Sequence, residues 1–181
     1  MNKSQIRNKI IKTRKKKFDK NLQINLGKFI SILKIDKSNL KNIGGYYPSN
    51  YEIDDLAILD FLEKKNFKVS LPIITKDNQM NFYSWSRNDP LKINKFGIPE
   101  PVTSKVYYPD ILLVPLVAYD GGLNRLGYGG GYYDRYIEKL EKIKKVTKIG
   151  LAFSFQKISH IPIDQYDKRL DFVVTEREIL R

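Results

Sequence analysis

Apolar residues recur along the chain at two spacings, and the helical spacing dominates its beginning. From residue 3 to residue 33 they return every three or four positions, which predicts one or two helices. A second amphipathic stretch, residues 53–65, predicts another helix, for which Ser49 or Asn50 can serve as N-cap. Glu52 would then lie in the first turn, where the helix dipole favours a carboxylate.

Shorter apolar runs between the helical stretches predict strands. The run at residues 109–118 is apolar without alternation, as expected for a central strand that is covered on both faces. Further strands are expected at residues 67–74, 80–85, 148–153 and 171–175, with a helix from Tyr132 to Ile143. Strands that alternate with helices are typical of an α/β fold, and we expect a mainly parallel sheet.

Polar and glycine-rich segments mark the expected connections. Residues 42–50 and 75–78 are predicted to be loops from their Gly, Pro and Asn content, and the strand at 80–85 is expected to belong to an edge hairpin. The polar segment that follows, up to Lys95, is predicted to be a connection. Residues 96–101 contain two prolines and should run extended along the surface.

The most informative connection is the glycine-rich stretch from Arg125 to Arg135, between the apolar strand and the next helix. Consecutive glycines allow a ligand to approach the backbone closely, and amide groups at a helix N-terminus favour anions. The dinucleotide fingerprint fails because Tyr132 stands where its last glycine should be, and the Gly-Lys of the nucleotide P-loop is absent. A turn that only permits tight packing is the alternative. The flanking arginines and Asp134, which could hold Mg²⁺ between phosphates, favour a phosphate-binding loop.

The charge balance supports an anionic partner. Lys and Arg number 33 against 20 Asp and Glu, a net charge of +13, which favours nucleic acid, a phosphate-bearing cofactor or a multiply carboxylated substrate. A lysine-rich surface that only aids solubility is the alternative. Lys3 and Arg7 are four residues apart and could reach one polyphosphate, whereas statistics favour a solvated helix face for the cations of this segment. These cations are Lys3, Arg7, Lys9, Lys12, Arg14, Lys15, Lys16, Lys17 and Lys20.

Composition excludes several other chemistries. There is no cysteine, which rules out disulfides, thiolate metal sites and cysteine nucleophiles, and His160 is the only histidine. No apolar run approaches the length needed to cross a bilayer, so we expect a cytoplasmic protein without a membrane partner. A length of 181 residues predicts one domain spanning residues 1–181.

The segment from Asn124 to Arg135 resembles the signature of the 5-formyltetrahydrofolate cyclo-ligase family, also called methenyltetrahydrofolate synthetases. The resemblance includes residues 96–101, 109–120 and 167–176 and reaches the N-terminus, so it covers nearly the whole chain. It implies a three-layer α/β/α fold related to the sugar-phosphate isomerase and CoA-transferase group. It also implies ATP-dependent cyclisation of 5-formyltetrahydrofolate to 5,10-methenyltetrahydrofolate, with release of ADP and phosphate. The formyl oxygen would attack the γ-phosphate, and N10 would then close the ring.

The resemblance further implies roles for individual residues. Arg125 is implied as the catalytic residue, and Glu52 and Phe96 as folate-binding residues. Asp134 and Asp167 are implied as Mg²⁺ ligands, with Asp171 as the rival to Asp167. The implied ATP site comprises Lys3, Arg7, Arg125, Gly127, Tyr128, Gly129, Gly130, Gly131, Tyr132 and Tyr133.

The resemblance also bears on partners. It implies ATP and 5-formyltetrahydrofolate, whose glutamate tail can be extended, as the substrates. We further expect a monomer and no nucleic-acid partner. One position departs from the family pattern, because Leu123 stands where the family usually has glycine. This departure puts the backbone path into the loop in question. Two rival hypotheses remain: a nucleic-acid-binding module, favoured by the basic charge and many tyrosines, and an isomerase or transferase of related fold that needs no ATP.

Overall fold

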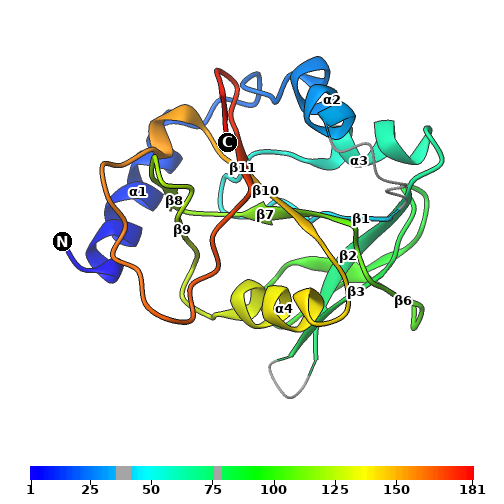
Figure 1. Ribbon diagram of the computed structural model, residues 1–181. Coiled ribbons are helices and arrows are strands. Elements are labelled where there is room, and N and C mark those ends of the chain that lie inside the picture. The colour runs from blue at the N-terminus through cyan, green and yellow to red at the C-terminus, as the bar shows by residue number, and fades with distance from the viewer. Residues whose placement is uncertain (36–41, 76–78) are drawn as a thin grey trace.

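A central sheet organises the molecule (Figure 1). The computed structural model describes residues 1–35, 42–75 and 79–181. Within these residues, eight strands form the sheet in the order β12-β11-β10-β7-β1-β2-β3-β6. The five strands from β11 to β2 are mutually parallel, whereas β12, β3 and β6 join antiparallel. Their bounds are β1 Asn42–Gly44, β2 Lys68–Ile74, β3 Met80–Ser84, β6 Val106–Tyr107, β7 Ile111–Pro115, β10 Thr147–Leu151, β11 Phe172–Val174 and β12 Ile179–Leu180.

Helices cover both faces of the sheet and give three layers. The helices are α1 (Lys3–Lys17), α2 (Leu26–Ile35), α3 (Leu56–Glu63) and α4 (Tyr132–Glu141). On β7, Ile111 and Leu113 pack in one cluster with α2 and α3, whereas Leu112 and Val114 pack in another with α4. This alternation confirms the expected central strand covered on both faces, and with it the mainly parallel α/β/α arrangement.

Helix α1 lies beside the sheet and packs on the segment that follows β7 (Figure 1). Its Ile6 and Ile10 contact Val117, Ala118 and Leu126. This segment includes the small pair β8 (Ala118–Tyr119) and β9 (Arg125–Leu126), which leads into the glycine-rich stretch. A short 3-10 helix, Ser154–Gln156, follows β10. No helix in the described ranges is both long and apolar enough to cross a membrane.

Two expectations about residues 42–55 were wrong. Residues 42–44 are the parallel strand β1 rather than a loop, and a Cβ on Gly44 would lie 2.7 Å from Phe82 and Pro109, so this glycine allows close packing. Helix α3 begins at Leu56 with Asp55 as N-cap, and Asp55 makes no side-chain capping bond. Glu52 therefore lies before the helix and not in its first turn.

The segment between β3 and β7 also differs from expectation. Leu91–Ile93 forms β4, which pairs with β5 (Pro99–Pro101), so the predicted connection contains half of a hairpin. The hairpin of β2 and β3 is confirmed, but β6 covers β3 and forms the edge of the sheet. Three residues of the predicted turn, 76–78, lie outside the described residues.

Candidate active site

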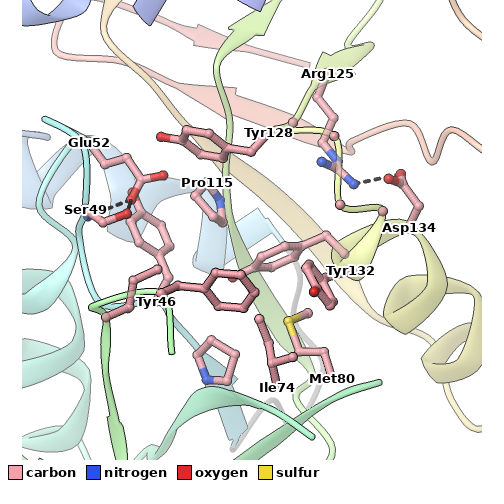
Figure 2. A pocket seen from close by; sticks show the side chains of 18 of the residues that line it. Tyr46, Ser49, Glu52, Ile74, Met80, Pro115, Arg125, Tyr128, Tyr132 and Asp134 are labelled. Carbon is pink, nitrogen blue, oxygen red and sulfur yellow. Dashed lines mark hydrogen bonds and ion pairs between the residues drawn. The ribbon is translucent and has the colours of Figure 1, made fainter. Parts of the chain in front are cut away.

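A cavity of about 1300 Å³ opens at the carboxyl ends of β1, β2 and β7 (Figure 2). Its walls come from α1, residues 46–52, the tip of the β4–β5 hairpin, the glycine-rich stretch and the loop that holds residues 164–167. Ligands of open α/β sheets bind at this end of the strands. The volume exceeds the 300–1,000 Å³ or so of a site for one small ligand, so the cavity has room for more than one small ligand.

The glycine-rich stretch adopts a path that only glycine follows easily. Gly129 and Gly131 have φ of +101° and +67°, in the left-handed region. Gly131 is the N-cap of α4, so the N-terminus of this helix lies in the cavity wall. Such a helix end favours an anion. The structure therefore supports the phosphate-binding interpretation over a turn that serves packing alone.

Helix α1 is tied to this loop by Arg7. The Arg7 Nε donates a hydrogen bond to the Gly127 carbonyl at 2.7 Å, and the guanidinium would lie 3.3 Å from a Cβ on Gly129. Residues 120 positions apart in the chain thus share one wall of the cavity. The structure thus places Arg7 beside the glycine loop, and a role of Arg7 in ATP binding stays a prediction.

Two further cations of the cavity are paired with the proposed metal ligands. Arg125 Nη2 lies 2.7 Å from Asp134 Oδ1 (Figure 2), which also accepts a bond from the Lys168 amide. Lys3 Nζ lies 2.6 Å from Asp167 Oδ2 and 2.8 Å from Asp164 Oδ2. Burial lowers the pKa of Lys3, but its hydrogen bonds to the two carboxylates outweigh this and raise it. Lys3 is therefore a full positive charge at neutral pH.

Glu52 lies at another side of the cavity from the ion pair of Arg125 (Figure 2). Its side chain is buried, and Oε2 accepts bonds from the Ser49 amide at 2.8 Å and the Ser49 hydroxyl at 3.2 Å. Burial raises the pKa of Glu52, although bonds from Ser49 and Tyr128 counteract it. The two residues before Glu52, Asn50 and Tyr51, have left-handed backbones with φ of 48° and 61°.

Phe96 is presented by the tip of the β4–β5 hairpin. The side chain is 51% exposed and contacts the Tyr132 ring edge to face, with centroids 6.4 Å apart. The Asn94 carboxamide oxygen accepts bonds from the amides of Phe96 and Ile98 and so shapes the tip. An exposed aromatic ring at the cavity wall is available to stack on a flat ligand.

The structure brings every predicted site residue to this cavity, from five separate segments of the chain. The lining includes Lys3, Arg7, Glu52, Phe96, Arg125, Gly127, Tyr128, Gly129, Gly130, Gly131, Tyr132, Tyr133, Asp134 and Asp167. Asp171 is not part of the lining, and its carboxylate accepts a bond from the Lys148 amide instead.

Sequence reasoning missed two charged residues at or near the site. Asp164 shares Lys3 with Asp167, and its only sequence signal is its place in a polar loop three residues before Asp167. Arg14 is 1% exposed, which contradicts the solvated helix face expected for it. Nothing in its local sequence distinguishes Arg14 from the lysines that follow it.

The carboxylates of the cavity suit a metal ion whose remaining ligands are substrate oxygens and water. Among the described residues, no group of three or more His, Cys, Asp or Glu side chains is placed to hold a metal ion. Mg²⁺ at phosphate sites is held by one or two carboxylates together with phosphate oxygens and water. Asp134 and Asp167, both in the cavity wall, supply that number of carboxylates.

Fold and cavity together define a class, that of α/β proteins with an anion-binding glycine loop at the carboxyl ends of their parallel strands. Comparison with known families narrows this class to one family. The model of the 5-formyltetrahydrofolate cyclo-ligase family matches residues 1–176, and the chain belongs to this family.

Known relatives agree with this assignment. The chain is 36% identical over 141 residues to the 5-formyltetrahydrofolate cyclo-ligase of Haemophilus influenzae, with 74% of each chain covered. Among solved structures, the NMR structure of Aquifex aeolicus 5,10-methenyltetrahydrofolate synthetase is 33% identical, with a TM-score of 0.75, and covers 100% of this chain and 93% of its own. The Mycoplasma pneumoniae synthetase is 25% identical, with a TM-score of 0.70 and coverage of 98% and 100%.

Proposed function

We propose that this chain, acting as one domain, catalyses the ATP-dependent cyclisation of 5-formyltetrahydrofolate to 5,10-methenyltetrahydrofolate. The observation that carries the proposal is one cavity with two chemically distinct sides. One side has the glycine loop, Arg7 and Arg125, which suit a polyphosphate, and the other has the buried carboxylate of Glu52, which suits a ring with N–H donors. Family membership agrees with both substrates.

The reaction needs placement and charge neutralisation more than a protein nucleophile. The formyl oxygen of the folate forms a bond to the γ-phosphorus of ATP, and ADP leaves. N10 then attacks the formyl carbon, loses its proton, and the oxygen departs as part of inorganic phosphate. Arg125, which is 7% exposed, would neutralise the charge that develops on the transferred phosphoryl group in a site with little water.

Two cations of the cavity are neutralised by carboxylates. Arg125 is paired with Asp134 and Lys3 with Asp167, so two of the predicted phosphate-binding cations each hold a predicted metal ligand. When ATP enters, Lys3 and Arg125 can turn to the phosphates while the carboxylates become free. Asp134 and Asp167 would hold Mg²⁺, which would supply positive charge to neutralise the phosphates. The cations would then pair with the phosphates and the carboxylates with Mg²⁺, so that no charge is left without a partner.

Two finer features belong to the same proposal. The protein would act as a monomer, since the lining of one chain already supplies groups suited to both substrates. A second hollow of about 280 Å³ shares Ser49, Asn50 and Glu52 with the cavity and contains Lys20, so an extended glutamate tail could leave the folate site in this direction. A polyglutamylated substrate should then have a lower KM than the monoglutamate, by a margin that Lys20→Gln reduces.

The direct test mixes the protein with Mg-ATP and 5-formyltetrahydrofolate and follows the methenyl chromophore together with ADP. We expect one ADP for each methenyl product. Arg125→Met should lower kcat by at least 100-fold and change the Kd of the folate by less than threefold, because Arg125 acts on the phosphoryl group. Lys142→Gln, which removes an exposed cation of similar size next to α4, is the control.

Three results would contradict the proposal. Absence of methenyl product at high protein concentration would refute the activity. Product formation without ATP would favour the isomerase or transferase class. Tight binding of single-stranded RNA with steep salt dependence, and no binding of ATP, would favour the nucleic-acid module.

A further inference from the structure

Arg14 is a buried cation that the proposed reaction does not use. It lies in the last turn of α1, and its side chain points into the protein, whereas Lys15, Lys16 and Lys17 beside it are exposed. Its Nη1 donates to the Leu116 carbonyl at 3.2 Å, at the end of β7, and its Nη2 donates to the hydroxyl of Tyr128. Arg14 therefore connects α1 to the middle of the glycine loop.

The burial of Arg14 is costly for stability. Among the described residues, Arg14 has no carboxylate within ion-pair distance, and its buried Nε has no hydrogen-bond partner. A charge taken out of water with so few partners costs free energy that an apolar side chain of similar size would not. A role at the site explains this arrangement better than a contribution to folding.

The bond from Arg14 determines where the Tyr128 hydroxyl directs its own proton. Arginine can only donate, so the Tyr128 hydroxyl accepts from Arg14 and keeps its own proton for another acceptor. The Tyr128 hydroxyl points toward Glu52 in Figure 2, so the Glu52 carboxylate is the group to which this proton is directed. Arg14 thus sets the orientation of a hydroxyl that faces Glu52.

Tyr128 and Arg14 also act on the pKa of Glu52. Burial raises the pKa of this carboxyl, and bonds from Ser49 and Tyr128 and the field of Arg14 act against burial. The titratable groups that interact with Glu52 further include Tyr46, Asp55 and Tyr133, of which Asp55 is a fully buried carboxyl, and Asp19, Lys20 and Asp54 line the neighbouring hollow. Arg14 is the positive charge in this group that interacts with Glu52.

We propose that Arg14 is a positioning residue for the folate substrate, acting through the Tyr128 hydroxyl to orient Glu52. The inference rests on the proposed function, in which Glu52 binds 5-formyltetrahydrofolate. Glu52 would accept from the substrate with the oxygen lone pairs that the two bonds from Ser49 leave free. Because Tyr128 also belongs to the glycine loop, Arg14 links the walls for the two substrates.

The test measures Kd for 5-formyltetrahydrofolate and for ATP separately by calorimetry, and KM and kcat for both. Arg14→Met should raise the Kd and KM of the folate at least tenfold, with those of ATP changed less than threefold. Arg14→Lys keeps a cationic donor and should stay within threefold of the original protein. Lys15→Gln removes an exposed cation from the next position of the same helix and should have no effect.

Tyr128→Phe supplies the decisive comparison, because it keeps the ring and removes only the hydroxyl. It should weaken folate binding on its own, and Arg14→Met should add less than twofold in that background. Full additivity of the two changes, or equal losses for ATP and folate, would overturn the inference and leave Arg14 with a structural role. Because Kd does not require turnover, a protein that binds folate without converting it would refute the proposed function while still deciding this point.

Discussion

At the residue scale, Leu123 combines a branched apolar side chain with a left-handed backbone. Its φ is 63°, its side chain is 5% exposed and packs in the cluster that includes α4, and its carbonyl accepts a bond from the Leu170 amide. This is the position where the family usually has glycine. The structure answers the question raised by that departure: the turn keeps a glycine-like backbone, and the side chain fills the core.

Leu123 gives a prediction about stability. Leu123→Ala should lower the free energy of unfolding by about 2–4 kcal/mol, because it creates a cavity and keeps the unfavourable φ. Leu123→Gly loses slightly more volume but relieves about 1–2 kcal/mol of backbone strain. Urea unfolding should therefore find the glycine variant at least as stable as the alanine variant. A clearly less stable glycine variant would show that φ at this position is not strained.

Asp134 gives a prediction about metal dependence. Asp134→Asn should raise the Mg²⁺ concentration that gives half-maximal rate by at least tenfold, because the carboxylate charge is lost. It should also lower stability by about 1–3 kcal/mol, since Arg125, with a side chain only 4% exposed, loses its ion-pair partner. Metal titration of the rate and thermal unfolding measure the two effects.

The control for Asp134 is Asp171→Asn. This carboxylate lies outside the cavity lining and bonds to the Lys148 amide. Its loss should leave the Mg²⁺ dependence unchanged. A shift of the same size in both variants would mean that the metal responds to overall charge and not to Asp134.

At the scale of elements, the glycine loop and the start of α4 act as one unit. Gly129 has a φ of +101°, which side-chain-bearing residues rarely adopt, and a Cβ there would meet the Arg7 guanidinium at 3.3 Å. Gly121, four residues before Arg125, has open space around its Cα and lies outside the cavity lining. Alanine substitutions at these two glycines can therefore be compared: one disturbs the backbone path of the loop, and the other only adds a methyl group.

We expect Gly129→Ala to raise the KM for ATP at least tenfold, which corresponds to about 1.4 kcal/mol of lost binding. The KM for the folate should change less, because Glu52 lies on another side of the cavity. Gly121→Ala should leave both values within twofold of the original. If the two alanine variants behaved alike in ATP kinetics, the loop path would not be what the nucleotide requires.

Sequence reasoning found the elements whose signals are long and local. The apolar run at β7 and the amphipathic spacing of α4 each extend over ten or so residues, and both were placed correctly. Strands β1 and β4 have three residues each, too few for a periodic pattern. Gly44 in β1 also gives a turn signal, although its role depends on contacts with Phe82 and Pro109 that are distant in sequence.

The residues that line the cavity could be named from the sequence because a recognisable pattern marks them, and their roles stay predictions. Resemblance placed Lys3, Glu52 and Asp167 at one site although more than a hundred residues separate the ends of this set. The burial of Arg14 could not be foreseen in this way. It depends on Tyr128 and on the Leu116 carbonyl, both more than a hundred positions away.

At the scale of the whole molecule, stability should depend on pH through a carboxyl in the core. Asp55 is 0% exposed, its Oδ2 accepts a bond from the Tyr46 amide, and its buried Oδ1 has no partner among the described residues. Burial raises the pKa of Asp55 well above its ordinary value, and the bond from Tyr46 only partly offsets this. The folded state therefore binds a proton that the unfolded state has already lost.

The sign of the pH effect follows from this difference. Between the ordinary pKa near 3.8 and the raised folded pKa, Asp55 lowers stability by about 1.4 kcal/mol for each rise of one pH unit. Asp55→Asn cannot ionise and keeps an acceptor for the Tyr46 amide. The variant should gain stability relative to the original protein as the pH rises from 5 to 8, as measured by urea unfolding. A difference that is constant with pH would contradict the raised pKa.

The attachment of α1 has a consequence for the order of events during folding. Lys3 meets Asp167 across 164 positions of sequence, and Arg7 meets Gly127 across 120, so these contacts close very long loops. Long-range contacts of this kind form late, after the sheet and its own helices have assembled. During refolding, the circular dichroism of the sheet should recover before the ability to bind ATP. For an interval, the protein should have a nearly native sheet but no activity, because α1 has not yet docked.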